Sequence, residues 1–145
     1  MSDTLYLVFE LGGQRVAIAS EIVDSVVHVV DIVPAPLAPP HIAGLAALRS
    51  RVITMVDARA ALGLEPVTGA GVRVTVVVTL DGHQYGLIVD RVDDVCAIPG
   101  DPAPVRARLG AGWSRAASAM LEHDGASLLL LDPAALIAGA RAEAA

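Results

Sequence analysis

The chain contains an internal repeat, and this repeat limits the folds that it can adopt. Residues 69 positions apart match without a gap, and the matched pairs are Leu11 with Leu80, Gly13 with Gly82, Ala17 with Gly86, Ile18 with Leu87, Glu21 with Asp90, Val23 with Val92, Asp24 with Asp93, and Val26 with Val95. Most apolar residues fall on apolar residues, and acids fall on acids. The pattern predicts that the chain is built from two copies of one small unit.

Both copies have the sequence character of β-strands. The first copy begins with the apolar run 5–11 and, after a Gly-Gly pair, the alternating run 14–19, which is typical of a β-hairpin. A second similarity, with a slightly longer offset, places the apolar run ending at Asp57 on the run ending at Asp132. Short strands with closely spaced turns favour small barrels, because closure removes exposed strand edges. We therefore predict a mainly β fold with two such units and short helices.

Residues 41–64 are the most informative part of the first copy. Apolar residues at every third position of 42–48 indicate a tight helical turn or an irregular loop. The β-branched run 52–56 predicts a buried strand. Asp57 follows this strand and precedes good helix formers, so we predict that its carboxylate caps a short helix.

The remaining segments are less regular. Residues 99–115 are rich in proline and glycine, which indicates a surface loop. The tail 138–145 is rich in alanine and is expected to be helical or frayed. We expect a single domain over residues 1–145, because a chain of this length can bury a self-sufficient core.

Composition and charge exclude several functions. The net charge of −6 and the pI near 5.0 argue against nucleic acid as a partner, because phosphate binding needs clustered basic residues. The start of the chain lacks the features of a signal peptide, and no stretch approaches the ~18 apolar residues of a membrane span. We therefore expect a cytoplasmic protein with no direct membrane insertion.

Most patterns that carry catalysis or metal binding are missing from the sequence. The histidines lack metal-ligand spacing, and there is no Gly-x-Ser-x-Gly or phosphate-binding glycine loop. One alternative remains, a small β-barrel that binds a ligand or acts as an enzyme through Asp90, Asp93, Asp94 and His83. Three carboxylates at a strand end are more often a solvated rim. We predict no catalysis, no cofactor and no metal, and hence an interaction module.

Residues 41–64 also resemble the signature of a known family. The motif Gly-x-x-x-Leu-Arg at 44–49, followed by Val-Ile-x-x-Val-Asp and a short helix ending in Leu-Gly, is similar to that of the CheW-like coupling proteins of bacterial chemotaxis. The resemblance extends from Leu5 to about Ile137. It implies two SH3-like five-stranded β-barrels packed side by side with a groove between them. It also implies a non-catalytic adaptor that couples chemoreceptors to a CheA-type histidine kinase in signal transduction.

The resemblance further implies partners and contact residues. In that family the groove holds the cytoplasmic tip of a methyl-accepting chemoreceptor, and the barrel ends meet the regulatory domain of the CheA-type histidine kinase. The position of Arg49 is implicated in receptor contact, and Gly44 matches the glycine of the same motif. The apolar residues Val23, Ile88 and Val89 match groove positions. For these three residues a role in the core is the alternative.

Three further features bear on this expectation. A surface ion pair of Arg49 with Asp57 or Glu21 is the alternative to receptor contact. The family usually has glycine after the motif arginine, where this chain has Ser50. It often has glutamate where this chain has Ser25, and the loss of that acid would remove a charge partner.

Overall fold

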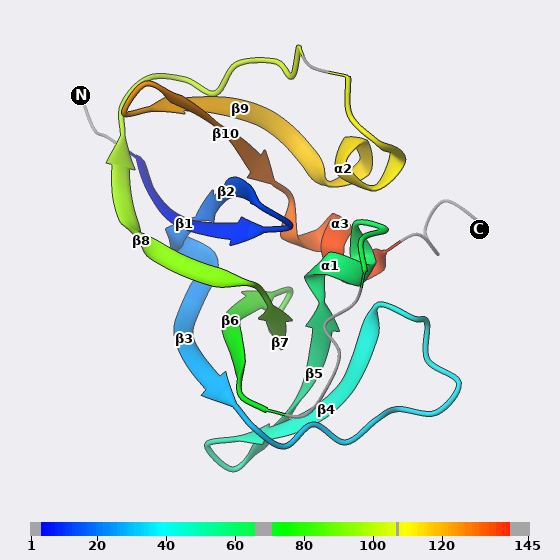
Figure 1. Cartoon of the computed structure of the whole chain (residues 1–145). Helices are drawn as coiled ribbons and strands as arrows, with labels where there is room; N and C mark the ends of the chain where they lie inside the picture. Colours follow the sequence, from blue (N-terminus) through cyan, green and yellow to red (C-terminus); the bar gives the residue numbers. More distant parts are fainter. Residues whose placement is uncertain (1–3, 66–70, 107, 140–145) are drawn as a thin grey trace.

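Ten strands and four short helices follow one another along residues 4–65, 71–106 and 108–139, which are the residues that the computed structural model describes (Figure 1). The strands are β1 (Thr4–Leu11), β2 (Gln14–Ala19), β3 (Val23–Val29), β4 (Ile42–Leu48), β5 (Arg51–Asp57), β6 (Arg73–Leu80), β7 (His83–Ile88), β8 (Arg91–Ile98), β9 (Ala117–His123) and β10 (Ala126–Leu131). The helices are the 3-10 helix η1 (Ser20–Ile22), α1 (Ala58–Ala61), α2 (Ala111–Ala116) and α3 (Pro133–Ala138).

The strands form two five-stranded sheets that lie side by side (Figure 1). Sheet A has the order β8-β1-β2-β10-β9, and sheet B has the order β3-β6-β7-β5-β4. The predicted fold class, mainly β with two SH3-like five-stranded units and short helices, is confirmed. Among the described residues no ladder joins β8 to β9 or β3 to β4, so each sheet curls without closing.

The two sheet orders become identical when every strand of one copy is replaced by its counterpart in the other. Each sheet therefore combines the first hairpin of one copy, β1–β2 or β6–β7, with three strands of the other copy. The expectation that one copy makes one unit is wrong. The sequence repeat and the spatial unit differ because β3 and β8 cross over to pair with the hairpin of the other copy.

Irregularities recur at equivalent places in the two sheets. The β1–β8 ladder skips Asp93, and the β3–β6 ladder skips Asp24, its match in the first copy. The β4–β5 ladder skips Ala43, and the β9–β10 ladder skips Ser118, which holds the same place in the second copy. Because a bulge bends its strand and increases the local twist, matching bulges give the two sheets the same curvature.

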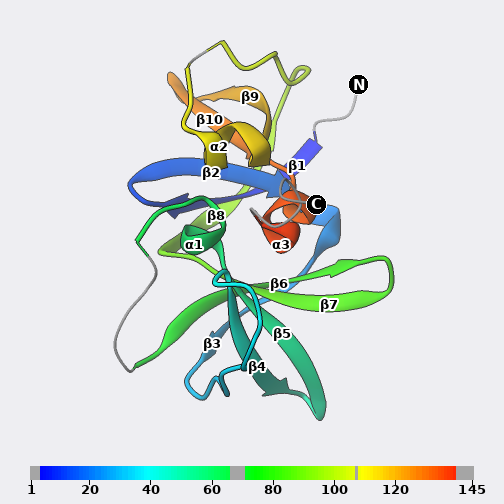
Figure 2. The same ribbon diagram turned by 90° about the vertical axis from the view of Figure 1, so that its right-hand side faces the viewer.

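Apolar side chains gather in three clusters. One lies inside sheet B and contains Val29, Ala46, Ile53, Met55, Val77 and Ile88. A second lies inside sheet A and contains Tyr6, Val8, Ala17, Ile98, Leu121 and Leu128. The third and largest lies between the sheets and includes residues of α1 and α3, which Figure 2 shows in this middle layer. The two units are therefore held together by a shared apolar core.

Equivalent aspartates cap two of the helices. Asp57 accepts hydrogen bonds from the backbone N–H groups of Arg59 (3.0 Å) and Ala60 (3.2 Å) at the start of α1. Asp132 accepts one from the N–H group of Ala134 (3.0 Å) at the start of α3. The prediction that Asp57 is an N-cap is confirmed.

Two local predictions are wrong. Residues 42–48 form the strand β4, and neither a helical turn nor an irregular loop, with Gly44 and Ala46 buried and Leu45 exposed. The segment 99–115 is not loop throughout, because helix α2 begins at Ala111 and its Trp113 packs against the core between the sheets. The predicted helical or frayed tail, residues 138–145, lies mostly outside the described residues, which end at 139. Within them, α3 ends at Ala138.

None of the helices in the described ranges combines the length and hydropathy that a membrane crossing requires.

Candidate functional site at the open end of sheet B

The tip of the β4–β5 hairpin carries serine at a turn position that favours glycine. Arg49 and Ser50 form a two-residue turn, and both have positive φ, 50° and 67°. The other two-residue hairpin turns in the described residues have the same geometry with glycine in second place, at Gly13, Gly82 and Gly125. A residue with a Cβ pays a steric penalty in this region, typically ~1–2 kcal/mol. Backbone strain that a fold tolerates often marks a functional position.

Arg49 borders a recess of about 260 Å³ at the open end of sheet B. All strands of this sheet contribute to the lining, which consists of Ser25, Leu48, Arg49, Arg51, Val77 and Gln84. We call this cavity the sheet B recess. The sequence had suggested that Arg49 projects into the groove between the units. Its tip lies instead at the end of sheet B that is remote from sheet A, because β4 and β5 extend away from the junction (Figure 1).

An aspartate with fixed partners is bonded to Gln84, one of the residues that line the recess. Asp24, the residue that the β3–β6 ladder skips, accepts hydrogen bonds from the hydroxyl of Thr79 and from Nε2 of Gln84 (2.8 Å). These bonds, first from Thr79 and then from Gln84, hold the pKa of Asp24 below its usual value, and the charges of Arg49 and Arg51 act in the same direction. Asp24 is therefore ionised at neutral pH.

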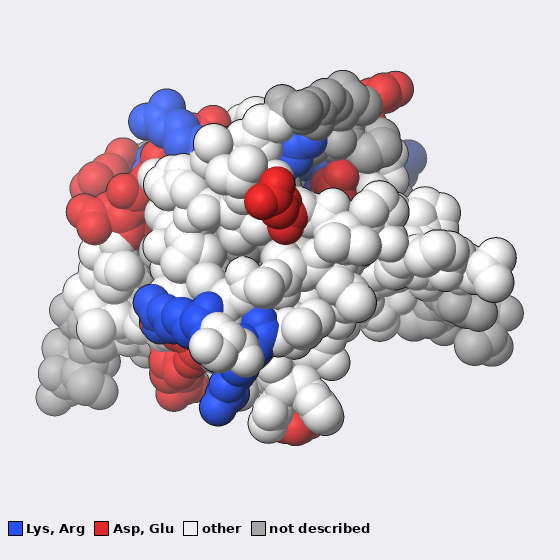
Figure 3. All heavy atoms as spheres, turned by 90° about the horizontal axis from the view of Figure 1, so that it is seen from below, with Lys and Arg blue, Asp and Glu red and all other residues white. Residues whose placement is uncertain are grey.

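The balance of charge around the recess is positive. Two arginines, Arg49 and Arg51, line the recess, and both act electrostatically on the nearby carboxylate of Asp24. Figure 3 looks onto this end of the molecule and shows basic groups (blue) directly beside an acidic group (red), with other charged groups elsewhere on the face. The arrangement suits an anionic group of a partner.

Arg49 does not make the surface ion pair that was the alternative to receptor contact. Asp57 lies at the far end of β5, ~20 Å away along a strand of this length. Glu21 belongs to η1, and in the described part of the chain no ion pair joins it to Arg49. The guanidinium of Arg49 is thus available at an exposed hairpin tip.

The other predicted contact residues lie deeper in the molecule. Gly44 is buried with φ of 148°, and a Cβ there would collide with the carbonyl oxygen of Val33, so its role is close backbone packing. Ile88 and Val89 are only 2% and 4% exposed, which favours their alternative role in the core. Val23 is partly buried and packs against the core between the sheets.

An apolar cleft of about 550 Å³ lies beside β4, near the same end of sheet B. It is lined by residues 28–31, 33, 45–48 and 52. Four of these residues are large apolar side chains with high exposure: Val30 (62%), Val33 (66%), Leu45 (41%) and Val52 (70%). Contiguous exposed apolar surface of this kind is typical of a protein interaction site.

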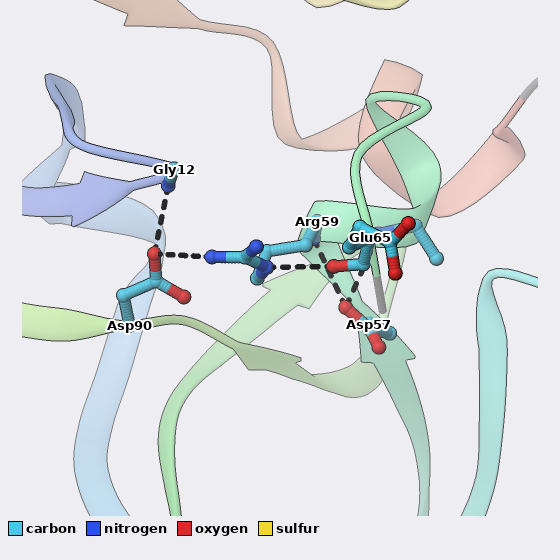
Figure 4. Close-up of polar contacts among 6 residues, drawn as sticks. Gly12, Asp57, Arg59, Glu65 and Asp90 are labelled. Atoms are coloured by element: carbon cyan, nitrogen blue, oxygen red, sulfur yellow. Dashed lines mark hydrogen bonds and ion pairs between the residues drawn. The ribbon is translucent and has the colours of Figure 1, made fainter. Parts of the chain in front are cut away.

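Asp90 belongs to a polar clasp between the two units (Figure 4). Its Oδ2 accepts hydrogen bonds from the backbone N–H of Gly12 (2.7 Å) and from Nη1 of Arg59 (3.0 Å). The Nε of Arg59 in turn donates to the carbonyl oxygen of Glu65 (2.7 Å). The clasp ties the β1–β2 turn of sheet A to helix α1. These contacts give Asp90 a structural role.

The remaining acids of the alternative catalytic cluster also have structural partners. Asp93 pairs with Arg15 (3.5 Å) and Arg91 (3.3 Å), and Asp94 accepts a hydrogen bond from the backbone N–H of Val95 (2.7 Å). These acids lie in sheet A, whereas His83 begins β7 of sheet B. Within the described ranges, no three His, Cys, Asp or Glu side chains are grouped as metal ligands. The predicted cluster is therefore not assembled as one site.

Comparison with known proteins agrees with this architecture. The model of the CheW-like domain family matches residues 5–141. The fold is similar to that of the scaffolding protein TtCheW from Thermoanaerobacter tengcongensis, with a TM-score of 0.77 and 22% sequence identity over 90% of this chain and 89% of that one. No curated protein matches the chain. Because the family model spans nearly the whole sequence, this chain belongs to the CheW-like domain family.

Proposed function

We propose that this chain is a non-catalytic adaptor that couples chemoreceptors to a CheA-type histidine kinase. Membership of the CheW-like family supports this role. The observation that carries the proposal is the strained Arg49-Ser50 tip, which places an exposed arginine at the border of a positively charged recess. Arginine is one of the residue types enriched among the few side chains that dominate binding energy at interfaces.

The receptor-facing part of this proposal centres on Arg49. Its partner is the cytoplasmic tip of a methyl-accepting chemoreceptor. Gly44 supports the site through the backbone, because it lets β4 approach Val33 closely. Val23 is partly buried and is the apolar contact that we assign to the receptor, and we assign Ile88 and Val89 a supporting role from within the core.

The kinase-facing part of the proposal uses the apolar cleft beside β4. Val30, Val33, Leu45 and Val52 offer an apolar surface at the end of a curled sheet. The regulatory domain of a CheA-type kinase, which has a similar fold, presents barrel ends of its own. Burial of the four side chains would supply the main driving force, since apolar burial contributes ~25 cal/mol per Å².

This role places the protein in the cytoplasm, where the receptor tip and the kinase are found. It would act there as a single domain over residues 1–145, without nucleic acid, cofactor or insertion into the membrane.

The proposal is tested by titrating the isolated protein with a receptor cytoplasmic fragment and, separately, with the kinase regulatory domain. We expect saturable binding to both. Asp94→Asn, which removes an acid of the alternative cluster without touching the sheet B recess, should leave both affinities unchanged. Binding to neither partner would contradict the adaptor role, as would a catalytic turnover that Asp94→Asn abolishes.

A further inference from the structure

The sheet B recess contains a hydroxyl group without a partner. The Oγ atom of Ser25 is shielded from solvent and has no hydrogen-bond partner among the described residues. Its neighbour Gln84 already donates to Asp24. A shielded hydroxyl that donates to nothing is unfavourable, and an acceptor supplied from outside would correct this.

The donors around this hydroxyl indicate which chemical group of a partner would fit the recess. Arg49 and Arg51 line the same recess, and guanidinium groups bind carboxylates through paired, charge-assisted hydrogen bonds. With Asp24 beside them, the two arginines leave one net positive charge, which balances one carboxylate better than a doubly charged phosphate. The floor of the recess is the fully buried Val77, so the group enters from the open end of the sheet.

We propose that the sheet B recess receives the carboxylate of a single aspartate or glutamate side chain from the receptor partner. This inference rests on the proposed adaptor function. Ser25 Oγ–H and the guanidinium groups of Arg49 and Arg51 donate to this carboxylate.

The equivalent end of sheet A does not fit such a group. Asp94 occupies the place of Ser25, Asp124 that of Arg49, and Ala126 that of Arg51, as the alignment of the two copies and their strand pairings show. Two acids there would repel a carboxylate. The sheet A end therefore provides a matched internal control.

The first test needs no partner, because Ser25→Glu places a carboxylate in the recess directly. At pH 7 this variant should melt at a higher temperature than Ser25→Gln, which fills the same space without charge. The difference should vanish as the introduced carboxyl is protonated, because a carboxylate stabilised by arginines has a lowered pKa and stabilises the fold only when ionised. A Ser25→Glu variant that is less stable than Ser25→Gln at pH 7 would overturn the proposal.

The second test measures affinity for a receptor cytoplasmic fragment. Ser25→Glu should weaken binding at least tenfold, since the recess is already filled, and should leave the affinity for the kinase regulatory domain unchanged. Ala126→Glu, which adds the same charge at the sheet A end, should change receptor affinity by less than twofold. If Ser25→Glu binds the fragment as tightly as wild type, the proposal fails and the adaptor function stands. If wild type binds neither partner, the adaptor function fails, and with it a receptor as the source of the carboxylate.

Discussion

The open ends of sheets A and B share one backbone and carry opposite chemistry. Both ends contain a bulged aspartate, an equivalent hairpin tip and the same order of strands. In sheet B the lining positions hold Arg49, Arg51, Ser25 and Gln84, and the equivalent positions in sheet A hold Asp124, Ala126, Asp94 and Arg15. The bulges and caps that maintain the fold are kept in both copies, whereas the side chains at the ends differ. The difference indicates that only one end is suited to an anionic partner.

The largest effect should come from Gly44. In Gly44→Ala the added Cβ would collide with the carbonyl oxygen of Val33, and φ of 148° is unfavourable for alanine. We expect a loss of roughly 3 kcal/mol in the free energy of unfolding. The equivalent position in β9 already carries a Cβ, at Ala119, so Ala119→Gly should cost only about 0.5–1 kcal/mol. If chemical denaturation shows equal losses of unfolding free energy for Gly44→Ala and Ala119→Gly, the close packing at Gly44 does not distinguish β4 from β9.

The two helix caps should differ by a smaller amount. Asp57 is buried and accepts two backbone hydrogen bonds, whereas Asp132 is exposed and accepts one. Asp57→Ala should therefore lower the unfolding free energy by about 1–2 kcal/mol, and Asp132→Ala by about 0.5–1 kcal/mol. Both variants should keep their affinity for partners while folded. A folded Asp57→Ala variant that binds neither partner would contradict a purely structural role for this residue.

The hairpin tips allow an exchange of residues between the two sheets. Ser50→Gly relieves a positive φ of 67° and should raise the unfolding free energy by about 0.5–1 kcal/mol. Gly125→Ser places serine at the equivalent tip, where φ is 77°, and should lower it by a similar amount. Thermal melts of the two variants should shift in opposite directions. A destabilised Ser50→Gly variant would show that the tip of sheet B is not strained.

The smallest effect concerns acid stability. The pKa of Asp24 in the folded protein lies below its ordinary value of 3.8, so its ionised form stabilises the fold above that pH. This contribution is lost as the pH falls through the folded pKa. Asp24→Asn should therefore reduce the loss of stability on acidification below pH 3.8, measured by denaturation at successive pH values. An unchanged pH profile would mean that the bonds from Thr79 and Gln84 do not favour the carboxylate in solution.

Local rules were sufficient to predict much of the fold. The hairpin turns, the strand character and the aspartate cap at Asp57 depend on residues within a few positions of one another. The same rules failed at 42–48, where small and apolar residues at every third position fit a helix, although Gly44 in fact permits close strand packing. They also failed at α2, because Gly112 suggested a loop. A Cβ at Gly112 would collide with the carbonyl oxygen of Leu62.

Pairings between distant segments could not be predicted from the sequence. The exchange of strands between the copies was hidden, because β3 could pair equally well by pattern with its own hairpin or with that of the other copy. For the same reason Arg49 was identified from its motif, but its neighbour Gln84 was not. The one available signal was the match of Asp24 with Asp93, which marks equivalent bulges in the two sheets.

The most direct test of the account compares three charge reversals: Arg49→Glu at the sheet B tip, Asp124→Arg at the equivalent sheet A tip, and Arg108→Glu on an exposed loop. Each variant is titrated against a receptor cytoplasmic fragment and against the kinase regulatory domain. We predict that Arg49→Glu alone weakens receptor binding, by at least tenfold or ~1.4 kcal/mol. Its stability should change by no more than about 0.5 kcal/mol, and its kinase affinity should persist. Unchanged receptor affinity, an equal loss in Arg108→Glu, or unfolding of Arg49→Glu would contradict the assignment of the sheet B end as the receptor site.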